Sequence, residues 1–218
     1  MADLTAVDYI WKNGEIVPWE QATTHVLTHA LHYGSGVFEG IRCYHNTDTD
    51  EAVIFRLEDH MKRLHNSAKI ARMELPYSID ELCQATIGII KANKLKSCYI
   101  RPLAYYGYGQ MGVDPTGAPV DVIIAVWPWD AYLGEEALKN GVSVGISSWR
   151  QRSFNAIPPA VKSSASYMNS ILAKLEAKEH GYAEAVMLNE AGHVCEGTGE
   201  NLFIVRDGIL MTPPLGDG

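Results

Sequence analysis

The sequence of 218 residues lacks several features that mark special classes of protein. It has few cysteines, and Cys43, Cys83, Cys98 and Cys195 form no CxxC pair. Neither a disulfide framework nor a cysteine-based zinc site is therefore expected. The longest strongly apolar stretch, 122–127, is far shorter than the roughly 20 residues that a membrane-spanning helix needs.

An excess of positive charge is also absent. The chain has 18 Lys and Arg against 26 Asp and Glu, a net charge of −8, and no basic cluster, which argues against a nucleic-acid binder. Residues 1–5 show neither the basic nor the apolar segment of a secretory signal. With 47% hydrophobic residues, the composition is that of an acidic globular protein, and we expect it in the cytoplasm.

The first half of the chain is predicted to consist of strands and two helices. A hairpin over 9–17 turns at Asn13-Gly14, which suits the positive φ angles of a tight turn. From Glu58 the apolar residues follow a helical period, and Ser78 with Glu81 forms a capping box that begins a second helix ending near residue 93. Two strands are expected next, at 98–106 and 120–127.

A break in composition at 127–134, where Pro and Gly flank three aromatic residues, separates the two halves. The second half is predicted to start with a strand at 142–149. A helix over 163–180 follows, with the apolar face Met168, Ile171, Leu172 and Leu175, and further strands lie near 185–188, 202–205 and 209–211. The pattern indicates an α+β or mixed α/β protein in two parts.

Single residues with possible chemistry have ordinary interpretations as well. Lys162 directly precedes the long helix, whose positive dipole end disfavours an ammonium, yet by position alone a solvated lysine is the preferred interpretation. Glu196 lies among glycines, and Arg63 lies on the polar side of its helix, so each is either a ligand-binding residue or a solvated one. Arg101, inside a strand, needs a partner or a pocket.

Two apparent motifs are rejected. His25, His29 and His32 have helical spacing, but no acidic or thiol partner is near in sequence, so no metal site is expected. The GxGxxG match at 107–112 is followed by turn residues instead of a helix, so it does not predict a dinucleotide site.

Taken together, these segments resemble the branched-chain-amino-acid aminotransferases, pyridoxal-phosphate enzymes of fold type IV. The resemblance implies their two-domain, mixed α/β architecture, with a small N-terminal domain at 1–127, a linker at 128–140 and the incomplete start of a larger cofactor-binding domain at 141–218. The matching stretches keep the family's order along the chain: 28–42, 60–64, 99–102, 128–129 with 132–134, Lys162 with Tyr167, and 196–203.

The resemblance also implies roles for individual residues. Lys162 is the residue expected to bond covalently to pyridoxal phosphate, and Glu196 is expected to pair with the ring nitrogen. Tyr167 is expected to hydrogen-bond the ring oxygen, and Arg63 to bind the phosphate. The residues expected to line the substrate pocket are Tyr33, Phe38, Tyr99, Arg101, Trp129 and Tyr132.

The implied activity is transamination between branched-chain L-amino acids (Leu, Ile, Val) and 2-oxoglutarate by a homo-oligomer, at least a dimer. A D-amino-acid aminotransferase or an aminodeoxychorismate lyase of the same fold stays open, as does a fragment that acts only as a binding module. The chain stops at 213–218, short of a family chain. We therefore expect it to be a fragment that, expressed alone, binds pyridoxal phosphate poorly and shows little or no transamination.

Overall fold

The computed structural model describes residues 4–129 and 135–217. The chain divides into two compact units. The N-terminal unit comprises Met1–Tyr132 and Val161–Ala165, and the C-terminal unit comprises Leu133–Ala160 and Ser166–Gly218. Lys162 therefore belongs to the N-terminal unit, although it is remote in sequence from most of that unit.

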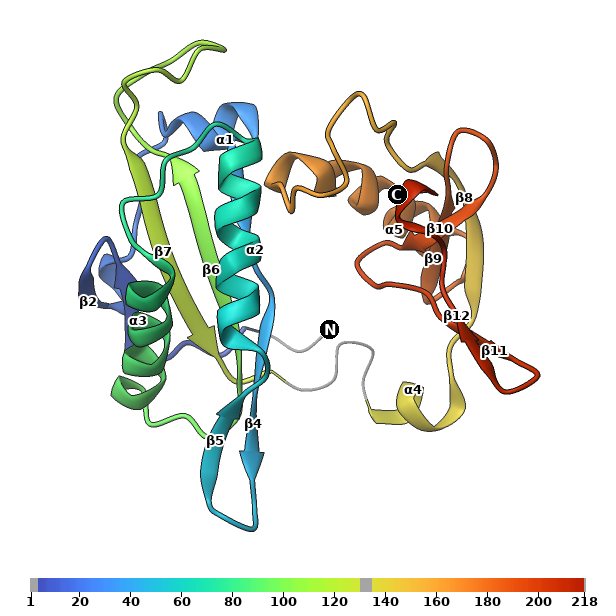
Figure 1. Cartoon of the computed structure of the whole chain (residues 1–218), viewed down its shortest axis with the longest axis horizontal. Coiled ribbons are helices and arrows are strands. Elements are labelled where there is room, and N and C mark those ends of the chain that lie inside the picture. The colour runs from blue at the N-terminus through green and yellow to red at the C-terminus, as the bar shows by residue number, and fades with distance from the viewer. Residues whose placement is uncertain (1–3, 130–134, 218) are drawn as a thin grey trace. The chain divides into compact units, whose positions relative to one another are not determined.

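The N-terminal unit is built on an antiparallel sheet in the order β2-β1-β7-β6-β4-β5, with β3 also paired to β6 (Figure 1). The predicted hairpin is confirmed, with φ angles of 48° at Asn13 and 93° at Gly14. The predicted strands β6 and β7 are also confirmed. The strands are β1 (Tyr9–Lys12), β2 (Glu15–Pro18), β3 (Gly36–Phe38), β4 (Ile41–Asn46), β5 (Glu51–Ile54), β6 (Cys98–Tyr106) and β7 (Val120–Trp127).

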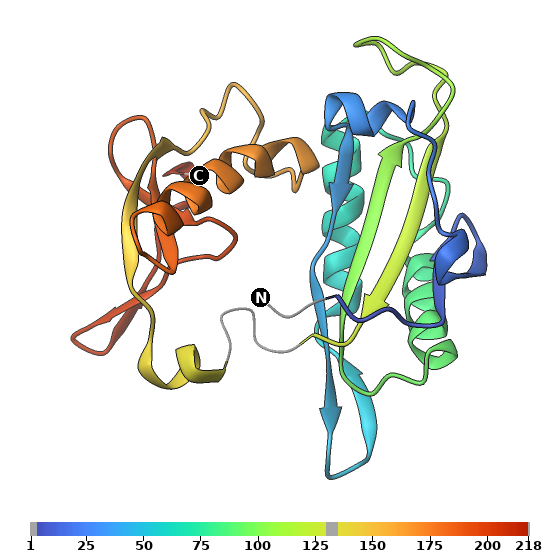
Figure 2. The ribbon, with the colours of Figure 1, turned by 180° about the vertical axis from the view of Figure 1, so that it is seen from behind.

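Helices α2 (Leu57–Ile70) and α3 (Ile79–Ala92) lie on one face of this sheet, and the view from behind has the strands in front of them (Figures 1 and 2). The predicted capping box is present, because Ser78 Oγ accepts from the Glu81 amide while Glu81 accepts from the Ser78 amide. Two short helices complete this unit, η1 (Trp19–Gln21) and α1 (His29–Tyr33).

Alternation along β6 determines which side chains can reach a ligand. Ile100 and Ala104 are fully buried, whereas Tyr99 and Arg101, on either side of Ile100, are only partly buried. Successive side chains of a strand point to opposite faces. Tyr99 and Arg101 therefore share one face of the sheet, and the fully buried residues share the other.

The C-terminal unit is a small βαβ arrangement with an added antiparallel strand. Strands β8 and β9 are parallel and are joined through α5, and β10 pairs antiparallel with β9. A hairpin of β11 and β12 follows. The elements are α4 (Glu135–Asn140), β8 (Val144–Arg150), α5 (Tyr167–Glu179), β9 (Glu184–Leu188), β10 (Val194–Gly197), β11 (Ile204–Arg206), β12 (Ile209–Met211) and η3 (Leu215–Asp217). The 3₁₀ helix η2 (Ser164–Ser166) directly precedes α5, and its first two residues are assigned to the N-terminal unit.

The predicted apolar face of α5 is wrong. The residues that α5 buries are Ser170, Ala173 and Ala177, whereas Met168 is 63% and Ile171 50% exposed. Small side chains let the helix approach β8 and β9 closely, and this close packing determines the buried face. The helix also begins later than predicted, because residues 164–166 form the turn η2.

Within the described residues, no helix is long and apolar enough to span a membrane. All four cysteines are free. Cys43 and Cys98 lie opposite each other on the neighbouring strands β4 and β6 without a disulfide bond. Burial raises the pKa of Cys98 to about 12. These thiols therefore stay protonated and are poor nucleophiles at neutral pH.

Candidate functional site

Lys162 is fixed between strand β3 and helix α2. Its amide donates to Ser67 Oγ at 3.1 Å, and its carbonyl accepts from the Phe38 amide at 3.1 Å. The next residue, Ser163, forms a bridge with Val37. The backbone of Lys162 is therefore hydrogen-bonded on both sides. These bonds fix the position from which its flexible side chain extends.

Glycine permits this close approach. Gly34 ends α1 with a φ of 64°, and a Cβ built on it would lie 3.0 Å from the Ala165 Cβ. A Cβ on Gly36 would lie 3.0 Å from Ser164 Oγ. A larger residue at either position would push the Lys162 segment away from β3.

The Phe38 ring lies beneath two cationic groups. Lys162 Nζ is 5.1 Å from the centroid of the ring, and Arg101 Cζ is 4.6 Å from it. The ring is only 8% exposed. Both distances are in the range of cation–π attraction, so Phe38 places an amine and a guanidinium on the same aromatic surface.

Arg101 continues this cluster toward the aromatic residues at the ends of β6 and β7. Its Nη2 donates to Tyr99 Oη at 3.1 Å, and the Tyr99 ring lies 4.6 Å from that of Trp129. Arg101 Nε is among the few buried polar atoms of the described chain that have no hydrogen-bond partner. A buried, unpaired N–H is costly, and an anion brought to this place would satisfy it.

Arg63 is oriented by a buried carboxylate. Glu39 is fully buried and accepts from Arg63 Nε at 2.5 Å, from Arg63 Nη2 at 2.6 Å and from His60 Nδ1 at 2.8 Å. Burial alone would raise the pKa of Glu39, but the hydrogen bonds and charges of Arg63 and His60 bring its pKa below the usual value. The Arg63 side chain itself is 52% exposed. Glu39 therefore presents an oriented guanidinium to the surface, one helical turn from the Ser67 that holds Lys162.

The predicted site residues of this unit are not all in the same cluster. Phe38, Tyr99, Arg101, Trp129 and Lys162 are linked by the contacts above, whereas Tyr33 lies on α1 and accepts from the Gly112 amide at 3.1 Å. Tyr132 lies outside the described residues.

The histidines of the first rejected motif form hydrogen bonds within the protein. His29 is buried and bonds to Ser35 Oγ and to the Gly112 carbonyl, while His32 bonds to the Val26 carbonyl. In the described parts of the chain, no group of metal-ligating side chains was found. The segment 107–112 is a loop, and no helix begins there.

In the C-terminal unit, Tyr167 and Glu196 both lie near Arg152. Tyr167 is the first residue of α5, and Glu196 lies on β10 and accepts a short hydrogen bond from Gln151 Nε2. Burial lowers the pKa of Arg152, and the charges of Glu196 and Tyr167 oppose that shift. Sequence reasoning missed Gln151 and Arg152, because nothing in the local pattern signals that residues just after β8 reach a carboxylate on β10.

A buried polar network holds the turn that follows Glu196. Glu184 is 5% exposed and accepts from Thr198 Oγ1 at 2.6 Å and from Lys174 Nζ at 2.5 Å. Burial raises the pKa of Glu200, which accepts from the Gly199 amide at 3.0 Å. These contacts connect the turn that follows Glu196 to β9 and α5.

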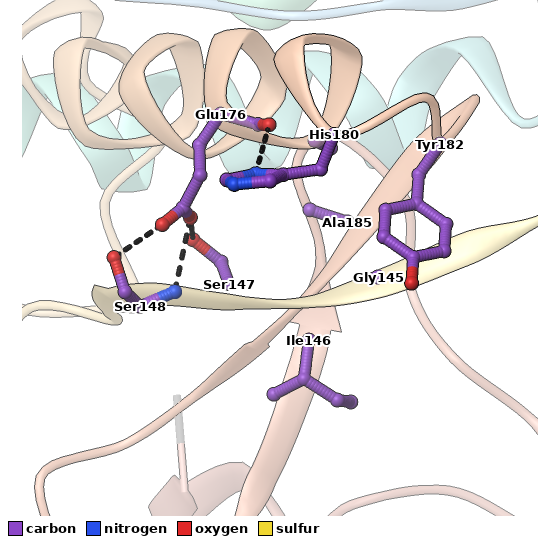
Figure 3. Close-up of a pocket in the computed structure, with 9 residues that line it drawn as sticks. Gly145, Ile146, Ser147, Ser148, Glu176, His180, Tyr182 and Ala185 are labelled. Carbon is purple, nitrogen blue, oxygen red and sulfur yellow. Dashed lines mark hydrogen bonds between the residues drawn. The ribbon is translucent and has the colours of Figure 1, made fainter.

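A separate cavity of about 320 Å³ lies in the C-terminal unit between β8 and the end of α5 (Figure 3). Glu176 is one of the residues that line the cavity. Its carboxylate accepts hydrogen bonds from Ser147 Oγ at 2.5 Å, from the Ser148 amide at 2.9 Å and from the Ser148 hydroxyl. These hydrogen bonds lower the pKa of Glu176. Among the described residues that line it, none is a predicted site residue. We interpret these contacts as a link between α5 and β8.

Comparison with known proteins identifies close relatives. Residues 36–218 match the family described as amino-transferase class IV. The chain is 53% identical over 209 residues to the branched-chain-amino-acid aminotransferase of Escherichia coli K12, covering 95% of this chain and 67% of the relative. The chain thus spans about two thirds of that relative's length.

Solved structures agree with the sequence matches. A structure of the Escherichia coli branched-chain amino acid aminotransferase superposes with a TM-score of 0.94 at 51% identity, over 97% of this chain and 69% of that one. The T.th. enzyme with pyridoxamine 5'-phosphate gives 0.89 at 48% identity, over 95% and 68%. The same enzyme complexed with N-(5'-phosphopyridoxyl)-L-glutamate gives 0.88 at 45% identity, over 95% and 67%. These similarities confirm the predicted family and fold class.

Proposed function

The chain belongs to the class IV aminotransferase family, and we propose that it transfers the amino group between branched-chain L-amino acids and 2-oxoglutarate with pyridoxal phosphate. The similarity to branched-chain-amino-acid aminotransferases at about half of all positions supports the amino-acid substrate. The complex of a relative with a phosphopyridoxyl derivative of L-glutamate supports the cofactor and the glutamate pair.

One observation carries the proposal. The Lys162 amine and the Arg101 guanidinium lie on the same Phe38 ring, and Arg101 Nε is buried with its N–H unpaired. A site for amino and oxo acids requires a lysine that can bond to the cofactor and a cation that can bind a carboxylate, and Lys162 and Arg101 provide these two groups side by side. Phe38 and Trp129 offer apolar surface to an aliphatic side chain, and Arg101 with Tyr99 offers donors to a second carboxylate.

The residues present also fit pyridoxal phosphate. Arg63 is oriented by Glu39 and half exposed, as a phosphate ligand should be, and Lys162 provides the amine that bonds to the cofactor. Glu196 is the carboxylate for the ring nitrogen, and Tyr167 is the donor for the ring oxygen. When bound, pyridoxal phosphate supplies an electron sink that stabilises negative charge at the substrate α-carbon.

Proton transfer and the choice of substrate depend on residues of the chain itself. Once the substrate amino group has displaced it from the cofactor, Lys162 would take the proton from the substrate α-carbon as a general base and deliver it to the cofactor carbon as a general acid. Glu196, ionised, holds a proton at the ring nitrogen. Arg101 distinguishes substrates, because only glutamate and 2-oxoglutarate bring a second carboxylate to it.

We include a homo-oligomer and a cytoplasmic location in the proposal. Large apolar side chains are exposed around α1 and the 107–119 loop, with Val113 86%, Val26 73% and Leu31 62% exposed. Apolar clusters of this kind are typical of protein interfaces, and a second copy of the chain is the partner that we propose. Free cysteines persist in a reducing compartment, which supports the location.

Trapping of the cofactor tests the proposed site. The purified chain is incubated with saturating pyridoxal phosphate, reduced with borohydride and mapped by peptide mass spectrometry. We expect the phosphopyridoxyl group on Lys162, and we expect Lys178→Met, a change of an exposed lysine, to leave the labelling intact. Predominant labelling of Lys174 or Lys178 would refute the assignment.

A further inference from the structure

Gln151 occupies a constrained position directly after β8. It is 3% exposed, and its backbone amide donates to the Leu188 carbonyl on β9 at 2.8 Å. The register between β8 and β9 shifts between Ile146 and Arg150, so this residue stands where regular pairing ends. Irregular strand ends of this kind often redirect a side chain toward a site.

Both ends of the Gln151 side-chain amide are in use. Its Oε1 accepts from the Arg152 amide at 3.0 Å and from Arg152 Nη1 at 3.1 Å, and its Nε2 donates to Glu196 Oε1. A guanidinium can only donate, and an ionised carboxylate can only accept. The amide therefore has one satisfactory orientation, with its oxygen toward Arg152 and its NH₂ group toward Glu196.

Arg152 is itself held in place, because its Nε donates to the Ile157 carbonyl at 3.2 Å. The three residues thus form a chain of contacts, from a half-buried cation through a neutral amide to a carboxylate. In a medium of low polarity, the cation polarises the amide and makes its N–H a stronger donor to the carboxylate.

We propose that Gln151, oriented by Arg152, is a positioning residue that keeps the Glu196 carboxylate ionised and directed for the pyridine nitrogen of the cofactor. The inference rests on the proposed function, because it assigns Glu196 a partner in pyridoxal phosphate. A neutral acid at this position could not keep the ring nitrogen protonated, so loss of the Gln151 donor would weaken the electron sink.

The alternative is that Gln151 only fills space at the end of β8. Two substitutions separate these possibilities. Gln151→Met keeps the length and apolar stem but removes both the donor and the acceptor. Gln151→Glu keeps an oxygen acceptor for Arg152 but replaces the NH₂ donor by a second carboxylate facing Glu196, so the two compete for one proton.

The measurement is the titration of Glu196 by carbon-13 NMR of labelled glutamate carboxyl groups in the full chain without cofactor. Glu196→Gln assigns the signal, and Gln84→Met, the same substitution at an exposed position of α3, is the matched control. Among the described residues, Arg152 and the adjacent Cys195 interact electrostatically with Glu196, and Tyr167 interacts with Arg152; none of the three is changed in either variant.

We expect the Glu196 titration midpoint to rise by about one pH unit in Gln151→Met, a tenfold change in its ionisation constant, and further in Gln151→Glu. Gln84→Met should leave it unchanged. Unchanged midpoints in both Gln151 variants, or loss of fold in both, would overturn the proposal.

A kinetic readout complements the titration. If Glu196 acts in transamination, the acid limb of the kcat profile should move to higher pH in Gln151→Met, while the KM for leucine changes little. A shifted Glu196 midpoint without any transamination in the parent chain would contradict the proposed function and leave the positioning of the carboxylate standing.

Discussion

The proposed choice of substrates can be tested at a single residue, Arg101. Its buried, unpaired Nε and its contact with Tyr99 are the observations that support its proposed role as donor to the second carboxylate of glutamate. We predict that Arg101→Ala lowers kcat/KM for glutamate and 2-oxoglutarate by roughly 10- to 100-fold more than for leucine, because a hydrogen bond to a charged group contributes about 1.5–3 kcal/mol. Steady-state kinetics with each substrate measures the difference.

Arg206→Ala, which changes an exposed arginine of β11, serves as the control for that experiment. It should affect neither substrate. Equal losses for leucine and glutamate in Arg101→Ala would assign Arg101 to the α-carboxylate shared by all substrates or to the fold.

Glu39 provides a prediction on pH. Because its folded pKa lies below the usual value, its contribution to stability is complete above the pKa of an unfolded glutamate, about 4.3, and is lost as the pH falls through the folded pKa. We predict that Glu39→Gln lowers the free energy of unfolding by about 1–3 kcal/mol at pH 7, and that the difference from the parent chain shrinks in acid. Urea unfolding at several pH values measures this.

The matched control for Glu39 is Glu58→Gln on α2, where the exposed carboxylate forms a surface pair with Lys62. It should change stability little, since surface pairs contribute weakly. A difference between Glu39→Gln and the parent chain that stays constant from neutral to acid pH would show that the buried carboxylate is not ionised in the folded chain.

At the scale of secondary-structure elements, Gly40 sets the spacing between the β3–β4 connection and β6. A Cβ built on Gly40 would overlap the Tyr99 hydroxyl. We predict that Gly40→Ala displaces Tyr99, destabilises the chain by about 1–3 kcal/mol and raises the KM for leucine and glutamate, because overpacking forces side chains from their rotamers. Urea unfolding and steady-state kinetics measure the two effects.

Gly88 in α3 is the control, because a Cβ there would meet nothing within 4 Å. Alanine at this helical position should stabilise the chain by about 0.5–1 kcal/mol and leave the kinetics unchanged. If Gly40→Ala behaves like Gly88→Ala, then Tyr99 is not packed as described.

The elements also show where sequence reasoning succeeds. Helix α3 is predicted to within a residue, because its capping box and apolar period are local signals. The buried face of α5 is not predicted correctly, because Ala173 and Ala177 are buried only through the close packing of α5 on β8 and β9. Strands as short as β3 and β10 carry too few residues for a visible alternation, and their pairing depends on distant partners.

In the candidate site, too, some features can be predicted from the sequence and others depend on the fold. The roles predicted for Lys162, Arg63 and Glu196 come from the resemblance to the family, because the local sequence alone also allows each to be a solvated residue. The resemblance places Lys162, Phe38 and Arg101 in one site, but nothing in the sequence predicts that both cations lie over the Phe38 ring. Nor does it predict that Glu39 orients Arg63, since such pairs form only when strands and helices assemble.

At the scale of the whole molecule, the exposed apolar residues of the N-terminal unit predict self-association. Size-exclusion chromatography with light scattering should give at least the mass of a dimer. Leu31→Lys with Val113→Glu should shift the mass toward a monomer, whereas Leu138→Lys, a change of an exposed residue on α4, should not. An active monomer in the parent chain would contradict this prediction.

The central claim is that this chain moves an amino group between branched-chain L-amino acids and 2-oxoglutarate by means of Lys162. The most direct measurement follows nitrogen-15 from labelled L-leucine into glutamate, with pyridoxal phosphate in saturating excess and Lys162→Ala measured in parallel. Because the chain alone is expected to bind the cofactor poorly, we predict a low rate of transfer even at this excess, with labelled glutamate (from added 2-oxoglutarate) and the leucine-derived oxo acid formed in equal amounts, and neither above the uncatalysed background in Lys162→Ala. Equal transfer in both proteins, preference for D-leucine, or release of pyruvate from aminodeoxychorismate without labelled glutamate would contradict the account.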